Sequence, residues 1–269
     1  MLSNLDELSD FSKHLADESE KLIKKYFRTS LNIESKEDKS PVTLADKEVE
    51  LKIRELINKK YPSHGILGEE FDSQNVESEF LWVIDPIDGT RSFIAGHKDF
   101  GTLIALIHNG KPIIGIINCP MHNERWIGII DKKTTMNDGV VKTSNTTSIN
   151  KSYFCTSGLY LENEHFKKSC DKIIKQTKYY RLGGDCYMYG MIASGLIDIV
   201  LEDTLKAHDY MALIPVIEGA GGKVTDKYGD PISINSDGSI LATANKALHN
   251  QIIDTVSYTH LTLPTKRIV

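Results

Sequence analysis

In the segment Trp82-Val83-Ile84-Asp85-Pro86-Ile87-Asp88-Gly89-Thr90, an apolar run typical of a buried strand ends in two carboxylates, a proline and a glycine. Asp85 and Asp88 flank a rigid proline, so both carboxylates and the Ile87 carbonyl can turn toward one point, as a hard cation requires. The next amides, from Gly89 onward, stand at a predicted helix start, where unpaired N–H groups and the helix dipole favour an anion. A metal site beside a phosphate site is the first interpretation, and an ordinary surface turn is the alternative.

The length and composition are typical of a folded globular protein. Its 269 residues suffice for one large domain or two lobes, and 40% hydrophobic residues, 26% charged residues and a net charge of -5 are typical of a folded cytoplasmic protein. Acids outnumber bases and no basic run carries aromatic residues, so we expect no nucleic-acid partner. Without a signal-peptide pattern or an apolar stretch of roughly 18 residues, we expect a cytoplasmic location and no membrane partner. The four cysteines are scattered, which favours reduced thiols.

The first half of the chain reads as helices followed by a mainly antiparallel sheet. Helical spacing of apolar residues predicts a first helix from Leu5 to about Arg28 and a second from Asp46 to about Lys60, with Asp46 as a candidate N-cap. Asn109-Gly110, between the predicted strands 102–107 and 112–117, is a strong hairpin signal. The predicted strands are 66–70, 80–84, 102–107, 112–117 and 124–130.

The second half alternates strands and helices. A polar stretch at 134–151 marks a boundary, which gives predicted lobes at 1–140 and 141–256. The predicted strands are 153–157, 179–182, 197–201, 223–225 and 239–243, and the predicted helices are 162–178, 186–194, 209–219 and 245–256. Residues 257–269 carry no periodicity and are interpreted as a non-native tail.

Three separated acidic segments share one pattern: Gly68-Glu69-Glu70, Asp85 to Thr90, and His208-Asp209 before a helix that ends in Glu218-Gly219-Ala220-Gly221-Gly222. In this order they resemble the inositol monophosphatase superfamily of Mg²⁺-dependent phosphatases, over nearly all of residues 1–256. The resemblance implies an α/β (α+β) fold, a layered αβαβα sandwich of the inositol monophosphatase/fructose-1,6-bisphosphatase type, and a homodimer.

The resemblance also implies roles for individual residues. One Mg²⁺ would be held by Glu69, Asp85 and the Ile87 carbonyl, and a second by Asp85, Asp88 and Asp209, with Glu70 supporting a possible third ion. Phosphate would bind the amides of Gly89 and Thr90 together with Arg91. The catalytic set would be Asp46, Glu69 and Thr90, in which Asp46 orients the Thr90 hydroxyl to help activate the water that attacks phosphorus in line. Metal ions suit this chemistry, because carboxylates alone would repel the phosphate ester.

Other segments bear on the substrate. Asp88 to Gly96, Phe100 to Leu106 and Arg181 to Tyr187 resemble the histidinol-phosphatase branch. Asp185 and Glu202 would face the leaving group, and two carboxylates suit an ammonium and an imidazole better than a neutral polyol. Alternatively, Asp185 is a helix N-cap and Glu202 a surface acid. Arg181 is either a substrate contact or an anchor for carboxylates within the fold.

His208 marks a departure, because many members of the superfamily have Trp-Asp where this chain has His208-Asp209. We interpret the histidine as a neighbour and not a ligand, since Mg²⁺ prefers oxygen. Lys36 and Lys39 are solvated loop lysines or residues at the mouth of the site.

The leading prediction is therefore a Mg²⁺-dependent histidinol-phosphate phosphatase of histidine biosynthesis, acting on a small-molecule phosphate monoester. An inositol-1-monophosphatase or a related sugar or nucleotide phosphatase is the alternative. A catalytically inert metal- or phosphate-binding protein is the non-enzymatic alternative. A calcium module is disfavoured, because the ladder of an EF-hand loop is missing after Asp85.

Overall fold

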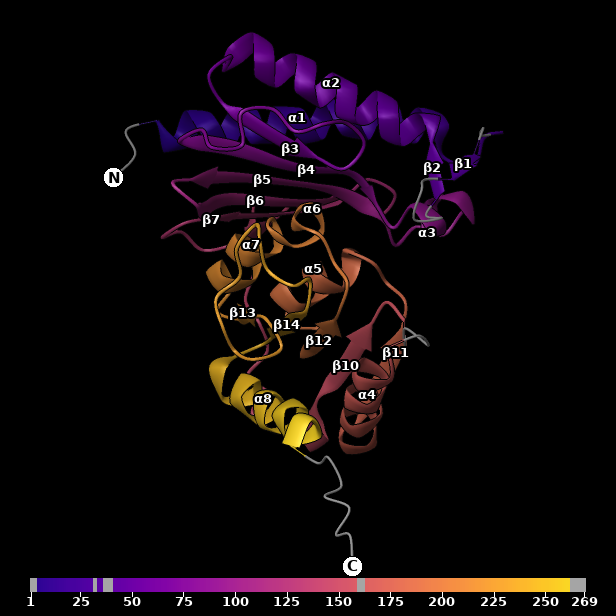
Figure 1. Ribbon diagram of the computed structural model, residues 1–269, viewed down its shortest axis with the longest axis vertical. Helices are drawn as coiled ribbons and strands as arrows, with labels where there is room; N and C mark the ends of the chain where they lie inside the picture. Colours follow the sequence, from indigo (N-terminus) through magenta and orange to yellow (C-terminus); the bar gives the residue numbers. More distant parts are fainter. Residues whose placement is uncertain (1–3, 31–32, 36–40, 159–162, 262–269) are drawn as a thin grey trace, which may run out of the picture.

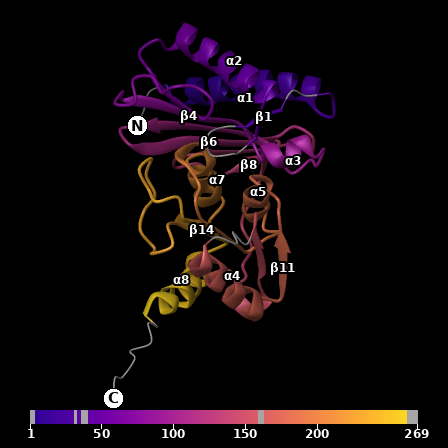
Figure 2. The ribbon, with the colours of Figure 1, turned by 45° about the vertical axis from the view of Figure 1, so that its right-hand side comes forward.

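Helical layers and sheets alternate along the molecule in the order α, β, α, β, α (Figure 1), as predicted. The computed structural model describes residues 4–30, 33–35, 41–158 and 163–261. The two sheets are linked through the middle helical layer, and Figure 2 shows the last pair of helices beyond the second sheet. Within the described ranges, no helix is both long enough and apolar enough to cross a membrane.

The first sheet has its strands in chain order, with β3 and β4 parallel and the later neighbours antiparallel. Its strands are β3 (Gly65–Gly68), β4 (Phe80–Asp88), β5 (Gly101–His108), β6 (Lys111–Cys119), β7 (Glu124–Ile129), β8 (Thr135–Met136) and β9 (Gly139–Val140). Its outer face is covered by α1 (Leu5–Tyr26) and α2 (Leu44–Lys60), with the short antiparallel pair β1 (Ile33–Ser35) and β2 (Pro41–Thr43) leading into α2 and α3 (Thr90–Ile94) following β4.

The second sheet has the order β11-β10-β12-β14-β13. Its strands are β10 (Tyr153–Thr156), β11 (Tyr179–Leu182), β12 (Ile199–Glu202), β13 (Lys223–Thr225) and β14 (Ile240–Thr243). The middle layer holds α5 (Tyr187–Ala193), α6 (Ala207–Tyr210) and α7 (Leu213–Gly219), and the last layer holds α4 (Glu164–Gln176) and α8 (Lys246–Leu261), with the 3-10 turn Ile149–Lys151 before β10.

Strand β4 explains why the first sheet is covered on both faces. Its side chains alternate between two cores: Leu81 and Val83 pack with the middle helices, and Trp82 and Ile84 pack with α1 and α2. This period of two is the geometry of a strand, and a strand buried on both faces reads as a continuous apolar run. The core of Leu81 and Val83 also contains Val200 of β12 and Ala242 of β14, so the two sheets share it.

The division into lobes at 140/141 stays a prediction. Strand β9 (Gly139–Val140) is the last of the first sheet, and β10 begins the second. Helix α8 continues to Leu261, five residues beyond the predicted Val256. The proposed tail is therefore described only in part. Lys36 and Lys39 lie outside the described residues.

Several predicted boundaries were wrong for local reasons. Strand β4 does not end at Ile84 but continues to Asp88, with a shift in register against β5 between Asp85 and Asp88. Pro86 lies in this irregular stretch and has no N–H to donate to a ladder. Helix α2 begins two residues before Asp46, because Thr43 is the N-cap and Asp46 completes a capping box.

The predicted helix 209–219 is divided into α6 and α7. Pro215 explains the division: its ring would clash with a helical carbonyl four residues earlier, whereas it fits the first turn of a new helix. The Asn109-Gly110 hairpin is confirmed, and both residues have positive φ, 48° and 77°.

A buried ion pair on α2 holds the turn that follows β3. Glu50 is 0% exposed and Arg54 is 7% exposed. Arg54 Nε donates to Glu50 Oε1 at 2.7 Å, and the Glu70 amide donates to Glu50 Oε2 at 2.7 Å. Arg54 Nη2 donates to the Phe71 carbonyl at 2.9 Å. The pair therefore fixes the backbone just after Glu69.

We expect Arg54→Met to lower the free energy of unfolding by about 3–5 kcal/mol, because the substitution leaves the Glu50 carboxylate buried without its cation. Urea denaturation measures the change. Lys52→Met is the matched control on the same helix, where Lys52 forms an exposed pair with Glu55, and it should cost less than about 1 kcal/mol. Equal stabilities of the two variants would contradict the role given to the buried pair.

Candidate functional site

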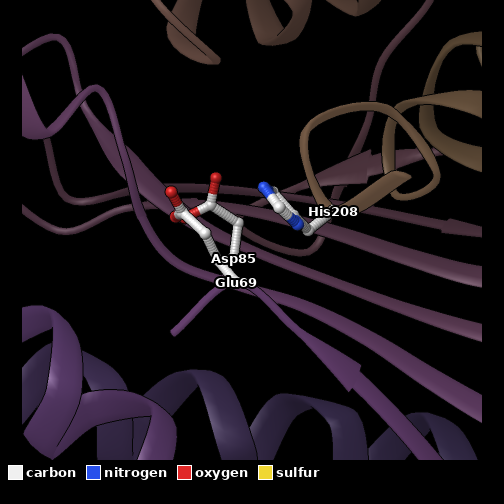
Figure 3. Close-up of side chains that lie close together, drawn as sticks. All are labelled: Glu69, Asp85 and His208. Atoms are coloured by element: carbon white, nitrogen blue, oxygen red, sulfur yellow. The ribbon is translucent and has the colours of Figure 1, made fainter. Parts of the chain in front are cut away.

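Four acidic side chains from three segments meet beside the irregular end of β4. The carboxylate oxygens of Asp85, Asp88 and Asp209 lie within 4.8 Å of one another, and Asp85 also belongs to a second group with Glu69 and His208. Figure 3 shows the Glu69 and Asp85 carboxylates side by side, with the imidazole of His208 turned toward them. Asp85 is therefore shared by both groups, while Glu70 belongs to neither in the described ranges.

Hydrogen bonds of the surrounding backbone hold Glu69, Asp209 and Asp88 in place. Glu69 lies in the turn held by Glu50 and Arg54. Asp209 lies in the first turn of α6, and its Oδ2 accepts a hydrogen bond from the Lys206 amide at 2.6 Å. Asp88 Oδ2 accepts from the Cys186 amide at 2.5 Å, which ties the end of β4 to the segment before α5.

The cluster has the electrostatic properties of a cation site. Burial, followed by the nearby charges of Glu69, Asp88 and Asp209, raises the pKa of Asp85 well above its ordinary value. Burial and the charges of neighbouring acids raise the pKa of Asp88 in the same way. Asp85 is 1% exposed and its Oδ1 has no hydrogen-bond partner in the described structure. An orphaned carboxylate oxygen among acids fits a bound divalent cation, which would neutralise the charge and fill the missing contact.

Thr90 lies between the cluster and α2. Its Oγ1 is 3.2 Å from Asp46 Oδ1 and 3.0 Å from the Ile87 carbonyl oxygen. The other carboxylate oxygen of Asp46 is held by the Thr43 amide at 2.7 Å. Burial, the largest cause, together with the charge of Glu69 raises the pKa of Asp46. The structure thus brings together the predicted pair Asp46 and Thr90, next to the Ile87 carbonyl.

Gly89 opens helix α3 toward a cavity. Its φ of 85° is in the left-handed region, and a Cβ there would lie 2.8 Å from the Asp185 Cγ, so this position requires glycine. The cavity has a volume of about 480 Å³. It is lined by Asp88, Arg91, Ser92, Ser157, Gly158, Gly183, Asp185, Cys186, Tyr189, Glu202, Leu205 and Asp209.

Asp185 and Glu202 are the acids of this cavity outside the cluster. Glu202 is 3% exposed, accepts from the Tyr189 hydroxyl at 2.7 Å and from the Ser157 amide at 3.2 Å, and burial raises its pKa to about 7. Asp185 Oδ2 accepts from Ser92 Oγ at 2.5 Å, and burial raises the pKa of Asp185. Neither alternative reading of these residues was right: α5 begins at Tyr187 with Cys186 as its cap, and Glu202 is buried.

Arg181 is not among the cavity residues. Its Nη2 lies 2.8 Å from Asp99 Oδ2, and its side chain is 55% exposed, so it anchors a carboxylate within the fold. Sequence reasoning missed Ser92 and Tyr189 as cavity residues. Ser92 follows Arg91 in the segment compared with the histidinol-phosphatase branch, whereas Tyr189 resembles any apolar residue of a short helix.

Comparisons with known proteins identify chains similar to this one. A sequence profile of the inositol monophosphatase family matches residues 4–260. The chain is 38% identical over 265 residues to the bifunctional phosphatase IMPL2, chloroplastic, of Arabidopsis thaliana, which covers 95% of this chain and 77% of the relative. It is 36% identical over 241 residues to a histidinol-phosphatase of Chlorobaculum parvum, covering 89% of this chain and 92% of the relative. A solved structure of an inositol monophosphatase from Zymomonas mobilis has a TM-score of 0.86 at 38% identity, covering 95% of this chain and 99% of that one.

We expect Mg²⁺ to stabilise the protein against heating relative to EDTA. A cation at 100 times its Kd adds about 2.7 kcal/mol per site to the free energy of unfolding. The gain should be larger at pH 8 than at pH 5, because protons compete with the cation for the carboxylates. The raised pKa values of Asp85 and Asp88 mean that, without a cation, the folded protein binds more protons than the unfolded chain. The stability without a cation therefore falls as the pH rises, and the cation restores it.

Thermal unfolding of wild type and Asp85→Asn measures this effect. The variant should lose most of the Mg²⁺-dependent rise in Tm, and Asp254→Asn, an exposed acid of α8, should keep it. An equal rise in wild type and Asp85→Asn would show that the cations bind elsewhere.

Proposed function

Because the chain belongs to the inositol monophosphatase family, whose members are phosphatases, we propose that it is a Mg²⁺-dependent phosphatase that hydrolyses histidinol phosphate in histidine biosynthesis. The observation that carries the choice of substrate is a pair of acids, the buried Glu202 and the partly buried Asp185, in the cavity next to the carboxylate cluster. The identity to a relative named histidinol-phosphatase supports the same choice.

Two cations fit the cluster around Asp85. Glu69, Asp85 and the Ile87 carbonyl would hold one, and Asp85, Asp88 and Asp209 the other; a third ion near Glu70 stays a prediction. When bound, they would neutralise the phosphate ester, lower the pKa of a coordinated water and stabilise the leaving alkoxide. Asp85 belongs to two groups of possible ligands, and within each group the ligand atoms lie within 4.8 Å of one another. This sharing supports two neighbouring cations.

The chain's own residues would bind and orient the substrate. The amides of Gly89 and Thr90 at the start of α3, with the Arg91 guanidinium, would hold the phosphate oxygens. The Thr90 hydroxyl, 3.2 Å from Asp46 Oδ1, would pass its proton toward that carboxylate while accepting a hydrogen bond from the attacking water. Glu69 would help to orient the same water.

The leaving alcohol would occupy the cavity between Asp185 and Glu202. Histidinol carries an ammonium and an imidazole, which are hydrogen-bond donors for carboxylates that are otherwise buried at a cost. The ammonium of the substrate would favour the ionised form of Glu202, whose pKa of about 7 leaves it poised near neutral pH. A neutral polyol would leave this charge uncompensated.

Inositol monophosphate is the main alternative substrate, because one similar solved structure is that of an inositol monophosphatase. A related sugar or nucleotide phosphatase is a further alternative, and a catalytically inert metal- or phosphate-binding protein is the non-enzymatic one.

The cytoplasmic location stays a prediction. So does the homodimer, for which the exposed side chains of edge strand β11, Tyr179, Tyr180 and Leu182, are a suitable surface.

Phosphate release from a panel of monoesters tests the substrate. Wild type should hydrolyse histidinol phosphate with a higher kcat/KM than inositol 1-phosphate, and Asp185→Asn should lower kcat/KM for histidinol phosphate about 10- to 100-fold, the value of a hydrogen bond to a charged group. The same substitution should change inositol phosphate hydrolysis by no more than a few-fold.

Glu218→Gln is the control, an exposed acid of α7 paired with Lys223, and it should leave both activities unchanged. A higher kcat/KM for inositol 1-phosphate than for histidinol phosphate in wild type would refute the histidinol-phosphate assignment. An equal loss of kcat/KM for both substrates in Asp185→Asn would show that Asp185 does not determine the choice of substrate.

A further inference from the structure

His208 lies at the carboxylate cluster and takes no part in the roles described so far. A ring nitrogen of His208 and carboxylate oxygens of Glu69 and Asp85 all lie within 4.8 Å of one another. The imidazole is 8% exposed and faces these carboxylates (Figure 3). Its Nε2 lies 3.8 Å from Asp209 Oδ1, which is beyond hydrogen-bond range.

A buried oxygen without a hydrogen-bond partner near His208 indicates a cation site. Asp85 Oδ1, a member of the same cluster, is buried without a hydrogen-bond partner in the described structure. Buried polar atoms of folded proteins nearly always have partners, so an orphaned oxygen points to a group that binds there. A cation placed among Glu69, Asp85 and His208 would contact both the orphaned oxygen and the imidazole.

We propose that His208 supplies a nitrogen ligand to the cation bound by Glu69 and Asp85, so that this position prefers Mn²⁺ to Mg²⁺. The inference rests on the proposed two-cation site and adds its metal preference. Mg²⁺ takes oxygen ligands, whereas imidazole suits transition metals, which a mixed carboxylate and imidazole site binds more tightly. The expectation that His208 is only a neighbour assumed a site made of oxygen alone.

Neighbouring residues support a ligand role over a packing role. Asp209, the next residue, points into the other carboxylate group through the same first turn of α6. The turn therefore presents two consecutive side chains to the two cation positions that share Asp85.

Pulsed electron paramagnetic resonance of the full-length protein loaded with Mn²⁺ tests the ligand directly. Wild type should show modulation from a coordinated ¹⁴N nucleus, and His208→Gln should lose it. Wild type grown with ¹⁵N-histidine should show the ¹⁵N pattern instead, which needs no substitution and holds even if a variant folds poorly. His108→Gln is the matched control, because His108 pairs with Glu79 at the opposite end of β5 from the cluster, and it should keep the ¹⁴N signal.

Equilibrium binding gives the second readout. His208→Gln should weaken Mn²⁺ binding at least tenfold, in line with the 10- to 100-fold losses typical when residues around a metal are changed. Mg²⁺ binding, measured by competition, should change by less than about threefold.

Two results would overturn the proposal in different ways. Mn²⁺ bound in an Asp85-dependent manner without a histidine nitrogen signal would refute the ligand role and leave the phosphatase assignment standing. Mn²⁺ binding that Asp85→Asn does not weaken would refute the cation site itself, and with it the proposed function.

Discussion

Asp85 is 1% exposed, and its neighbours Glu69, Asp88 and Asp209 carry the same charge as Asp85 when ionised. Burial removes the water that would separate these charges, so the group is unfavourable unless protons or cations compensate it. Burial and these neighbouring charges raise the pKa of Asp85 and of Asp88, which favours their protonated forms. Divalent cations give the same relief at neutral pH, and they bring with them the chemistry of phosphate hydrolysis.

The fold holds these charges together because each comes from a rigid element. Strand β4 is buried on both faces and carries Asp85 and Asp88 on its irregular end. The ion pair of Glu50 and Arg54 fixes the turn of Glu69, and the first turn of α6 presents His208 and Asp209. Such a site is stabilised by packing in both cores, so the protein can keep an arrangement that is locally unfavourable.

Much of this could be predicted from the sequence. The apolar run of Leu81 to Ile84 indicates a buried strand, and the spacing of Asp85, Pro86 and Asp88 indicates convergent oxygens. The layered fold is confirmed and the family is shown by the match over residues 4–260. Boundaries were less predictable: Pro215 divides a helix that periodicity joined, and Thr43 begins α2 before the acid that seemed to cap it.

The rest could not be predicted because it depends on contacts between distant segments. Burial of Glu202 follows from the hydroxyl of Tyr189, thirteen residues earlier, and from the Ser157 amide. Arg181 was a candidate for a substrate contact, but its guanidinium pairs with Asp99 and does not line the cavity. Likewise, His208 and Glu69 are far apart in the chain, so their approach to one point is a property of tertiary structure alone.

The proposed function and the proposed role of His208 both require two cations that share Asp85. A crystal structure of the protein with Mn²⁺, with anomalous scattering recorded from the metal, tests this sharing. We expect two anomalous peaks that both contact the Asp85 carboxylate, one beside Glu69 and one beside Asp88 and Asp209. A single peak, or peaks that leave Asp85 without a metal contact, would refute the shared site.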